Sequence, residues 1–213
     1  MQNETIEWTR TWRENADAEQ KRILLVGDSM IDGSKREVQN ALPDGYSISS
    51  FATSKGVDNP YYLRELEMLC EQEDFAYCAV YFNNGIHDHG QSPETFRNNL
   101  CATLKRLHAK IPNAVWIVGQ CTPVTPDRGD GNKNYIAPTT PEQAKGYPPY
   151  CARILAYNEA IRSVAAELGM FCFDAFSLLL EHPEFKTDPF HLNAEGYRFF
   201  GSSIAAQVME RIG

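Results

Sequence analysis

The sequence contains a serine, an aspartate and a histidine in positions from which they could share one active site. Ser29 ends a Gly-Asp-Ser tripeptide directly after an apolar run, where a strand would give way to a helix N-terminus. Asp188 and His191 stand three residues apart on a turn stiffened by Pro189. A serine becomes a useful nucleophile when an imidazole accepts its proton and a carboxylate orients that imidazole. These residue types suit covalent acyl transfer, although a helix cap and a surface turn are the simpler interpretations of each motif alone.

Two further segments could supply hydrogen-bond donors to a reacting carbonyl. Ser54-Lys55-Gly56 follows an apolar run and offers a glycine whose N–H a substrate can approach closely. Residues 82–88 read Phe-Asn-Asn-Gly-Ile-His-Asp and also follow an apolar run. An asparagine amide there could donate to an oxyanion, a contact whose loss elsewhere costs on the order of 2.7 to 4 kcal/mol. Both segments are equally natural as tight turns.

The elements that must position these residues can be predicted from the apolar pattern. Short apolar runs alternate with longer amphipathic stretches, which is typical of βαβ units and a mainly parallel sheet. About five strands are predicted, over residues 22–27, 46–53, 76–83, 114–121 and 170–174. Helices are predicted over 60–72, over 93–110 after a Ser92 cap, over 150–168, and after an Asn193 cap. The last helix carries an apolar stripe expected to face the core: Tyr197, Phe200, Ile204, Val208 and Ile212. Because ligands bind at the carboxyl ends of parallel strands, the four motifs are expected to meet at one edge of the sheet.

A chain of 213 residues fits a single domain, in which residues 1–20 form a polar N-terminal extension. Residues 122–149 form a loop far longer than an ordinary connection, and such loops are usually functional lids or disordered. Its place directly after a predicted strand would let it shape a substrate cleft. Its tyrosines would suit stacking on a sugar ring, although tyrosines pack against cores as readily: Tyr135, Tyr147 and Tyr150.

The composition excludes some partners. A formal charge of -8 argues against a nucleic acid, because such binding depends on Lys and Arg neutralising phosphates. No stretch approaches the roughly 20 apolar residues of a membrane span, so no membrane partner is expected and a small-molecule substrate fits better. The first 20 residues lack the basic start and apolar run of a secretory signal, which predicts a cytoplasmic protein; removal of a preceding signal would instead make it secreted or periplasmic.

The cysteines stand singly, with no C-x-x-C pair, which favours buried, reduced thiols over disulfides or a metal site. They are Cys70, Cys78, Cys101, Cys121, Cys151 and Cys172.

Taken in order, the four motifs resemble the four blocks of the SGNH (GDSL-like) hydrolase superfamily. That pattern is G-D-S near the N-terminus, a Gly after the second strand, an Asn after the third, and D-x-x-H before the last helix; the resemblance runs from Arg22 to the final helix. It implies a three-layer α/β/α, flavodoxin-like fold and a serine ester hydrolase without a cofactor. By the resemblance, Ser29 is the nucleophile, Asp188 and His191 complete the triad, and an oxyanion hole combines the Ser29 N–H, the Gly56 N–H and an Asn side chain.

The third block departs from the family's usual G-x-N-D. The chain is similar to a subgroup with F-N-x-G-L-H-D, in which the Asn precedes the Gly, so Asn83 is the first candidate donor and Asn84 the second. His87 is a third, as a neutral N–H donor, but His87 and Asp88 are better explained as support for the loop. A metal site at His87, Asp88 and His89 is not expected, because adjacent residues rarely converge on one ion.

The predicted reaction is two-step acyl transfer through an acyl-enzyme, with His191 taking and returning the proton. Asp28 is expected to anchor the turn at the nucleophile. No extended apolar groove is readable, so a short acyl group such as acetyl on a carbohydrate is preferred over a lipid. Two alternatives stay open: an acyltransferase that uses the same triad with a sugar acceptor, and a non-catalytic carbohydrate-binding domain of the same fold.

Overall fold

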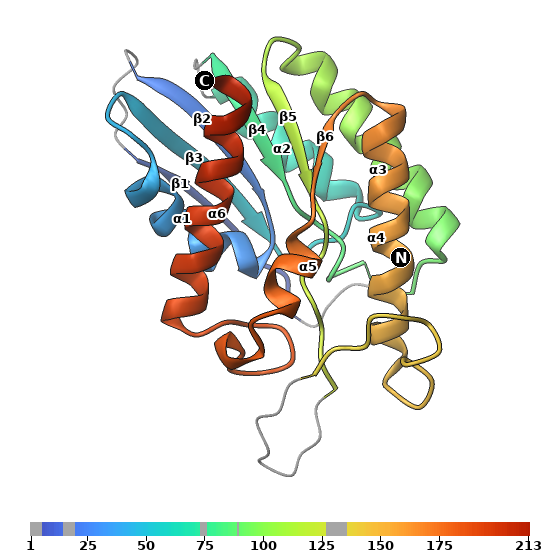
Figure 1. Cartoon of the computed structure of the whole chain (residues 1–213). Helices are drawn as coiled ribbons and strands as arrows, with labels where there is room; N and C mark the ends of the chain where they lie inside the picture. Colours follow the sequence, from blue (N-terminus) through green and yellow to red (C-terminus); the bar gives the residue numbers. More distant parts are fainter. Residues whose placement is uncertain (1–5, 15–19, 73–75, 89, 127–135) are drawn as a thin grey trace.

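Five parallel strands and one antiparallel strand form a single sheet with helices on both faces (Figure 1). The computed structural model describes residues 6–14, 20–72, 76–88, 90–126 and 136–213. The strands lie in the order β1-β3-β2-β4-β5-β6. The predicted three-layer α/β/α fold with a parallel sheet is therefore confirmed.

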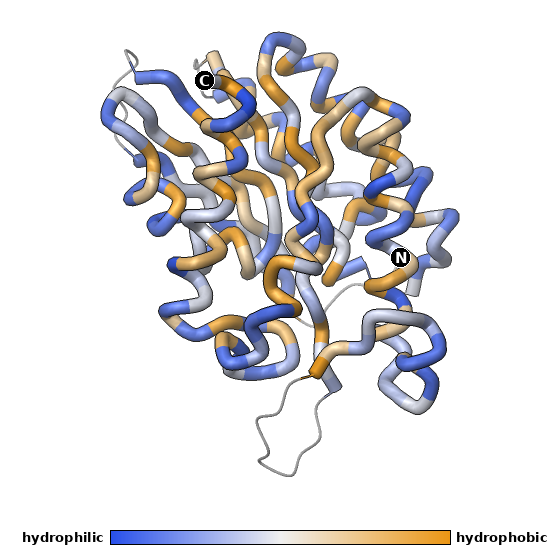
Figure 2. The backbone as a smooth tube through the Cα atoms, viewed as in Figure 1, coloured by the Kyte–Doolittle hydropathy of each residue, from blue (hydrophilic) through white to orange (hydrophobic). Residues whose placement is uncertain are grey.

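The centre of the sheet is β2, Lys21–Gly27, which pairs in parallel with β3, Tyr46–Thr53, and with β4, Tyr77–Phe82. Strands β5, Val115–Gly119, and β6, Phe171–Phe173, continue the parallel order beyond β4. All residues of β2 after Lys21 are buried, as expected for a strand covered by helices on both faces. Figure 2 shows the same arrangement as a concentration of hydrophobic residues along the strands. The five predicted strands agree with the structure to within one or two residues at each end.

The sixth strand, β1, lies within the predicted N-terminal extension. It spans Thr9–Arg13 and pairs antiparallel with β3, with Thr9 opposite Thr53. Four of its five residues are exposed and it has no apolar run, because it lies at the edge of the sheet. The sequence pattern that reveals a buried strand is therefore absent from it.

The helices are α1, Ser29–Ala41; α2, Pro60–Gln72; α3, Pro93–Lys110; α4, Pro149–Glu167; α5, Ala175–Leu180; and α6, Ala194–Ile212, with a 3-10 turn over Pro183–Phe185. All the α-helices except α4 begin after a residue whose side chain accepts from one of the first free amides. As predicted, Ser92 caps α3 and Asn193 caps α6, accepting from Thr95 N and Gly196 N. The short α5 and the 3-10 turn were not predicted, because six and three residues are too few for a helical period to be read.

Three cysteines are buried as expected, namely Cys101, Cys121 and Cys151, and all six are free thiols. Cys172 is exposed, and Cys70 and Cys78 are half-buried, so the expected burial of these three was wrong. Cys172 lies on β6, an edge strand whose outer side no further strand covers.

The apolar stripe of α6 packs as predicted at its centre, where Phe200, Ile204 and Val208 are fully buried. Tyr197 and Ile212 are partly buried at its two ends. Among the described residues, no helix combines the length and the apolar character needed to span a bilayer. Tyr135 lies outside the described residues, so the expectation for it is not addressed by the structure.

Helices α1 and α6 cross so closely that only glycine fits at one position. A Cβ on Gly201 would lie 2.7 Å from the Glu37 Cβ and 2.9 Å from the Val38 backbone nitrogen. We therefore expect Gly201→Ala to lower the free energy of unfolding by about 1 to 3 kcal/mol, since overpacking outweighs the gain of up to about 1 kcal/mol in helix propensity. Urea unfolding measures this change. Ser202→Ala, on the exposed side of the same helix, is the control, and equal stability of Gly201→Ala and wild type would contradict the close crossing.

Candidate active site

The β2–α1 turn presents Ser29 at the carboxyl edge of the sheet. Strand β2 ends at Gly27, where a Cβ would lie 2.7 Å from the Asn83 carbonyl oxygen, so the turn can be this tight only with glycine. Asp28 is fully buried and caps α1, since its Oδ1 accepts from Met30 N at 2.9 Å. Burial raises the pKa of Asp28, against the opposing effect of the nearby His87. Asp28 thus anchors the turn, in agreement with the prediction, and Ser29 becomes the first residue of the helix.

The three residues predicted to cooperate lie in one chain of hydrogen bonds. The Nε2 of His191 is 3.0 Å from the Ser29 Oγ, and its Nδ1 is 2.8 Å from the Asp188 Oδ2. The second oxygen of Asp188 accepts from the backbone N–H groups of Phe190 and His191, both at 2.8 Å. The Asp-x-x-His turn therefore fixes its own carboxylate, which in turn orients the imidazole toward Ser29.

The electrostatics of the turn keep Asp188 ionised. Partial burial acts to raise the pKa of Asp188, but the amides of His191 and Phe190 and the His191 ring outweigh it, so the pKa lies below its ordinary value. The side chains of Asp188 and His191 are 46% and 42% exposed. The site is therefore open to solvent on this side and not enclosed in a deep channel.

The turn that carries Gly56 follows β3, next to Ser29 in the sheet order. A Cβ at Gly56 would lie 2.6 Å from the Asp88 Oδ1, so no side chain fits there. Among the described residues, no protein acceptor is placed for the backbone N–H of Ser29 or of Gly56. Both amides are therefore available to a bound substrate.

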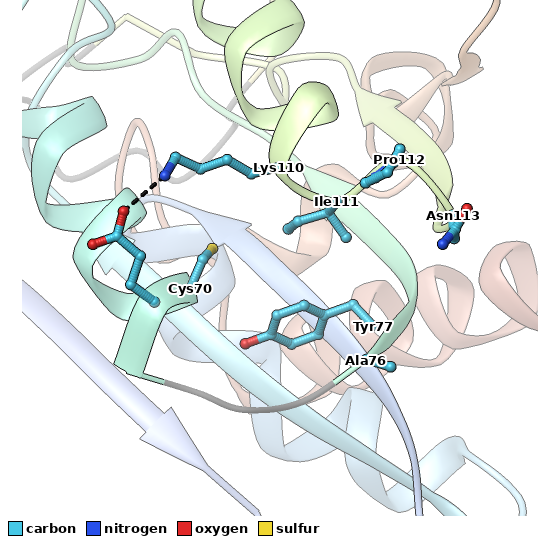
Figure 3. A pocket seen from close by; sticks show the side chains of 8 residues that line it. Cys70, Ala76, Tyr77, Lys110, Ile111, Pro112 and Asn113 are labelled. Carbon is cyan, nitrogen blue, oxygen red and sulfur yellow. Dashed lines mark hydrogen bonds and ion pairs between the residues drawn. The ribbon is translucent and has the colours of Figure 1, made fainter.

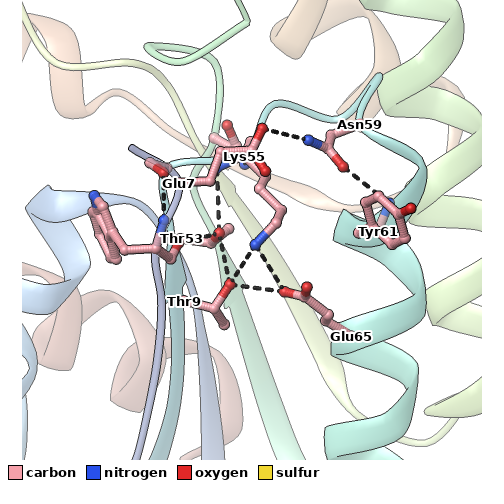
Figure 4. Close-up of polar contacts among 10 residues, drawn as sticks. Glu7, Thr9, Thr53, Lys55, Asn59, Tyr61 and Glu65 are labelled. Carbon is pink, nitrogen blue, oxygen red and sulfur yellow. Dashed lines mark hydrogen bonds and ion pairs between the residues drawn. The ribbon is translucent and has the colours of Figure 1, made fainter. Parts of the chain in front are cut away.

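The N-terminal segment holds this turn in place (Figure 4). The Lys55 ammonium, nearly buried, donates to the Thr9 Oγ1 at 2.8 Å and to Glu65 of α2 at 3.2 Å. Trp8 N donates to the Ser54 Oγ at 3.0 Å, and Ser54 N returns a bond to Trp8 O at 3.1 Å. The predicted extension is thus part of the structure that fixes the backbone next to Gly56.

The two asparagines of the third motif point in opposite directions. The Asn83 amide donates to the Gln120 and Gly119 carbonyls, at 2.7 and 3.3 Å, on the β5 side. The Asn84 amide donates to the Lys55 carbonyl at 3.2 Å, on the β3 side. Because β2 lies between β3 and β4, the Asn84 side chain crosses the edge of the sheet beside the β2–α1 turn, whereas Asn83 points away from it. The first-choice donor, Asn83, has both amide hydrogens directed at carbonyls and is not placed for that role.

Asp88 joins the third motif to the Gly56 turn, which fits the predicted supporting role. Its Oδ1 accepts from Val57 N and from the Gln91 side chain, both at 2.7 Å, and its carbonyl accepts from the Tyr157 hydroxyl at 2.8 Å. Burial raises the pKa of this fully enclosed carboxyl to about 7. His87 is half-buried near Asp28.

His89 falls outside the described residues. Within the part of the chain that the structure describes, no three His, Cys, Asp or Glu side chains gather as a metal ion would require.

Sequence reasoning missed Lys186, whose side chain is 6% exposed and lies beside the triad turn. Its ammonium donates to the Pro123 carbonyl at 2.7 Å and to the Phe190 carbonyl at 3.1 Å. A lysine two residues before the Asp-x-x-His motif carries no sign of burial in the sequence. Only its position directly before the motif could have drawn attention to it.

A hollow of about 310 Å³ at the other end of the sheet is a separate feature (Figure 3). Its lining includes Tyr77, where β4 begins, and Asn113, which precedes β5, and the Lys110–Glu71 ion pair borders it. Ser29 lies beyond the opposite, carboxyl ends of the strands. This hollow is therefore not part of the site around Ser29.

A three-layer α/β/α fold with a Ser-His-Asp chain at the carboxyl edge of its sheet is the arrangement of a serine hydrolase. The model of the GDSL-like Lipase/Acylhydrolase family matches residues 25–199, and the chain belongs to this family. It is accordingly a serine ester hydrolase. No curated protein sequence matches the chain.

Solved structures of low sequence identity share the fold. An acetyl xylan esterase superposes with a TM-score of 0.64 at 18% identity, covering 88% of this chain and 99% of that one. A lipase/acylhydrolase from Enterococcus faecalis gives 0.64 at 18%, with 90% and 97% covered. An aryl esterase from M. smegmatis gives 0.68 at 13%, with 90% and 99% covered. At these identities the likeness shows a common fold.

The buried Asp88 predicts a dependence of stability on pH. Because its pKa is raised in the folded protein, the folded state binds more protons than the unfolded state between about pH 4 and pH 7. The free energy of unfolding should therefore fall as pH rises through this range, by on the order of 1 to 3 kcal/mol. In Asp88→Asn this component should disappear, as urea unfolding at several pH values would measure. Asp44→Asn, an exposed carboxylate before β3, should retain the slope; an unchanged slope in Asp88→Asn would contradict the assignment.

Proposed function

We propose that Ser29, His191 and Asp188 are the catalytic triad of this ester hydrolase. The observation that carries the proposal is the position of the His191 ring, with one nitrogen 3.0 Å from the Ser29 hydroxyl and the other 2.8 Å from the Asp188 carboxylate. This geometry lets one imidazole take the serine proton while the carboxylate stabilises the imidazolium.

The reaction proceeds in two steps, acylation of Ser29 by the ester and hydrolysis of the acyl-enzyme. The Ser29 Oγ forms a bond to the ester carbonyl carbon as its proton passes to the His191 Nε2, and the carbonyl oxygen becomes an oxyanion. The tetrahedral intermediate then expels the alkoxide leaving group, which takes that proton from His191 and departs as the alcohol. A water molecule gives its proton to His191 and attacks the acyl-enzyme, which releases the acid and restores the Ser29 hydroxyl. Asp188 keeps its charge throughout and holds the ring.

The oxyanion is held by the Ser29 N–H, the Gly56 N–H and the Asn84 side chain. The two backbone amides have no protein acceptor among the described residues, and Asn84 lies on the Ser29 side of the β4 end. One of its two amide hydrogens faces the Lys55 carbonyl, and the side chain also lies beside the Tyr62 hydroxyl, so a bound oxyanion would take the second hydrogen in place of that hydroxyl. Asn84 therefore takes the role first expected of Asn83.

The substrate is a short acyl ester, most simply an acetyl group, on a carbohydrate. The exposure of Asp188 and His191 supports an open site that admits a large polar alcohol more easily than it shields a long acyl chain. The similarity to an acetyl xylan esterase supports the same class of substrate. Tyr150 contacts the Phe190 ring at 5.6 Å between centroids, which places an aromatic pair beside the triad turn. Such a pair suits the face of a sugar ring.

A series of p-nitrophenyl esters tests the reaction and the acyl group. Wild-type kcat/KM should be highest for acetate and fall at least about tenfold by octanoate, and acetylated xylan should release acetate. In Ser29→Ala, kcat should drop by on the order of 10⁴ or more, because nucleophile and base act as a unit. Ser202→Ala is the matched control.

Other results of this experiment would contradict the acyl group, the hydrolase activity or the triad. A rise in kcat/KM toward long chains would contradict the short-acyl assignment. Formation of a sugar ester when a sugar acceptor is added, in place of free acetate, would identify an acyltransferase. Ester cleavage that survives in Ser29→Ala would disprove the triad.

The two asparagines can be separated by paired variants. Asn84→Ala should lower kcat by about 10² to 10³ with KM changed less than about threefold, because an oxyanion donor acts mainly in the transition state. Asn83→Ala should instead lower the free energy of unfolding by about 1 to 3 kcal/mol, because it leaves two buried carbonyls without a donor. Steady-state kinetics and urea unfolding of both variants measure these effects. The reverse pattern would return the donor role to Asn83.

A further inference from the structure

Lys186 occupies a buried position between two segments that meet at the triad turn. Its ammonium donates to the Pro123 carbonyl, in the segment after β5, and to the Phe190 carbonyl, between the two triad residues of the turn. Neither carbonyl belongs to a helix or a strand. A charged group that is 6% exposed is costly to bury, so this arrangement needs a compensating role.

The surrounding bonds fix the ammonium in place. Lys186 and Leu192 form an antiparallel bridge, and Thr187 N donates to the His191 carbonyl at 3.0 Å, which closes the turn on itself. Thr125 N donates to the Pro189 carbonyl at 3.1 Å and joins the turn to the segment after β5. The Lys186 side chain spans the same junction, because it reaches both Pro123 and Phe190.

Lys186 precedes Asp188 by two residues on the same turn, and their charges influence each other. Burial lowers the pKa of Lys186 to about 8, and the Asp188 carboxylate opposes this effect. The facing residues 123–125 are Pro, Val and Thr, which carry no charge, and the nearest helix, α4, contributes the Tyr150 hydroxyl, which donates to the Thr125 carbonyl at 3.4 Å. The Asp188 carboxylate is the charge that acts on Lys186. The titratable groups nearby are His191 on the same turn and Tyr197 of α6, which binds the Leu192 backbone and is itself influenced by Asp188.

We propose that Lys186 is a positioning residue for the triad, whose ammonium ties the Asp188–His191 turn to the segment after β5 and offsets the Asp188 charge. The proposal rests on the proposed triad. In its protonated form, the ammonium holds the turn through charge-assisted hydrogen bonds, which are stronger than those of a neutral amine. Loss of that proton weakens the junction and leaves the Asp188 charge without its neighbour, so the activated geometry of His191 is less well held.

The test measures Ser29 reactivity and turnover as functions of pH. Wild-type kcat/KM for an acetyl ester, followed by acid release, should fall above an apparent pKa near 8, and the rate of labelling of Ser29 by a fluorophosphonate should fall in parallel. Lys186→Met should lower kcat at pH 7 by about 10- to 100-fold, change KM less than about threefold and lose the alkaline fall. Lys186→Arg should retain at least about a third of the wild-type kcat and also lose the fall near pH 8, because a guanidinium does not titrate there.

A control variant and the results that would contradict the role of Lys186 complete the test. Lys145→Met, an exposed lysine of the long loop, should match wild type in rate and profile. A wild-type profile that is flat from pH 7 to 9.5 would overturn the proposal even without a folded Lys186 variant. Retention of the alkaline fall in Lys186→Met, or a rate within twofold of wild type, would do the same. Absence of both ester cleavage and labelling in wild type would instead refute the proposed triad itself.

Discussion

The pairing of β2 with β3 on one side and β4 on the other is the constraint on which the site depends. Parallel strands end at the same edge, so this pairing brings Ser29, Gly56 and Asn84 together from segments 27 and 28 residues apart in the sequence. A one-residue slip would turn each side chain of β2 to the other face, and because β2 is buried on both faces the slip would disrupt the packing of two core layers. A one-residue slip of β4 against β2 would move Asn83 to the position of Asn84. Core packing and the positions of the two asparagines are therefore set by one interaction.

Four buried ionisable side chains surround the proposed site. Asp28 and Asp88 are fully buried, Lys55 and Lys186 nearly so, and each holds a backbone segment that carries a functional group. Three of them use hydrogen bonds from or to the main chain: Asp28 to Met30, Asp88 to Val57, and Lys186 to Pro123 and Phe190. Lys55 instead donates to the side chains of Thr9 and Glu65. A buried ionisable group contributes little net stability compared with an apolar side chain. Their value lies in geometry, since backbone turns of irregular shape have few other means of being fixed.

Much of this arrangement follows from the sequence, and the exceptions have physical causes. The spacing of apolar residues predicts the parallel strands and the long helices. Ser29 follows the first of these strands, and Asp188 and His191 precede the last helix. The choice between Asn83 and Asn84 could not be made, because it depends on which way each side chain points after the strand ends. Strand β1 was not predicted from the sequence, because an exposed edge strand needs no apolar residues. The sequence around Lys186 does not indicate that this lysine is buried, because the burial of its charge depends on Pro123, 63 residues away.

These exceptions share a feature that bears on how such sites are built. The residues proposed to perform the chemistry lie in short motifs beside strand or helix ends, whereas the residues that hold them are scattered: Thr9 near the N-terminus, Glu65 in α2, and Pro123 after β5. Their contributions are a hydroxyl, a carboxylate and a backbone carbonyl, which form no recognisable motif in the local sequence. The motifs therefore specify which atoms react, and the distant supports decide how well those atoms are aligned. Because small displacements at a reacting centre are costly in rate, the supports are as much a part of the catalytic apparatus as the motifs they hold.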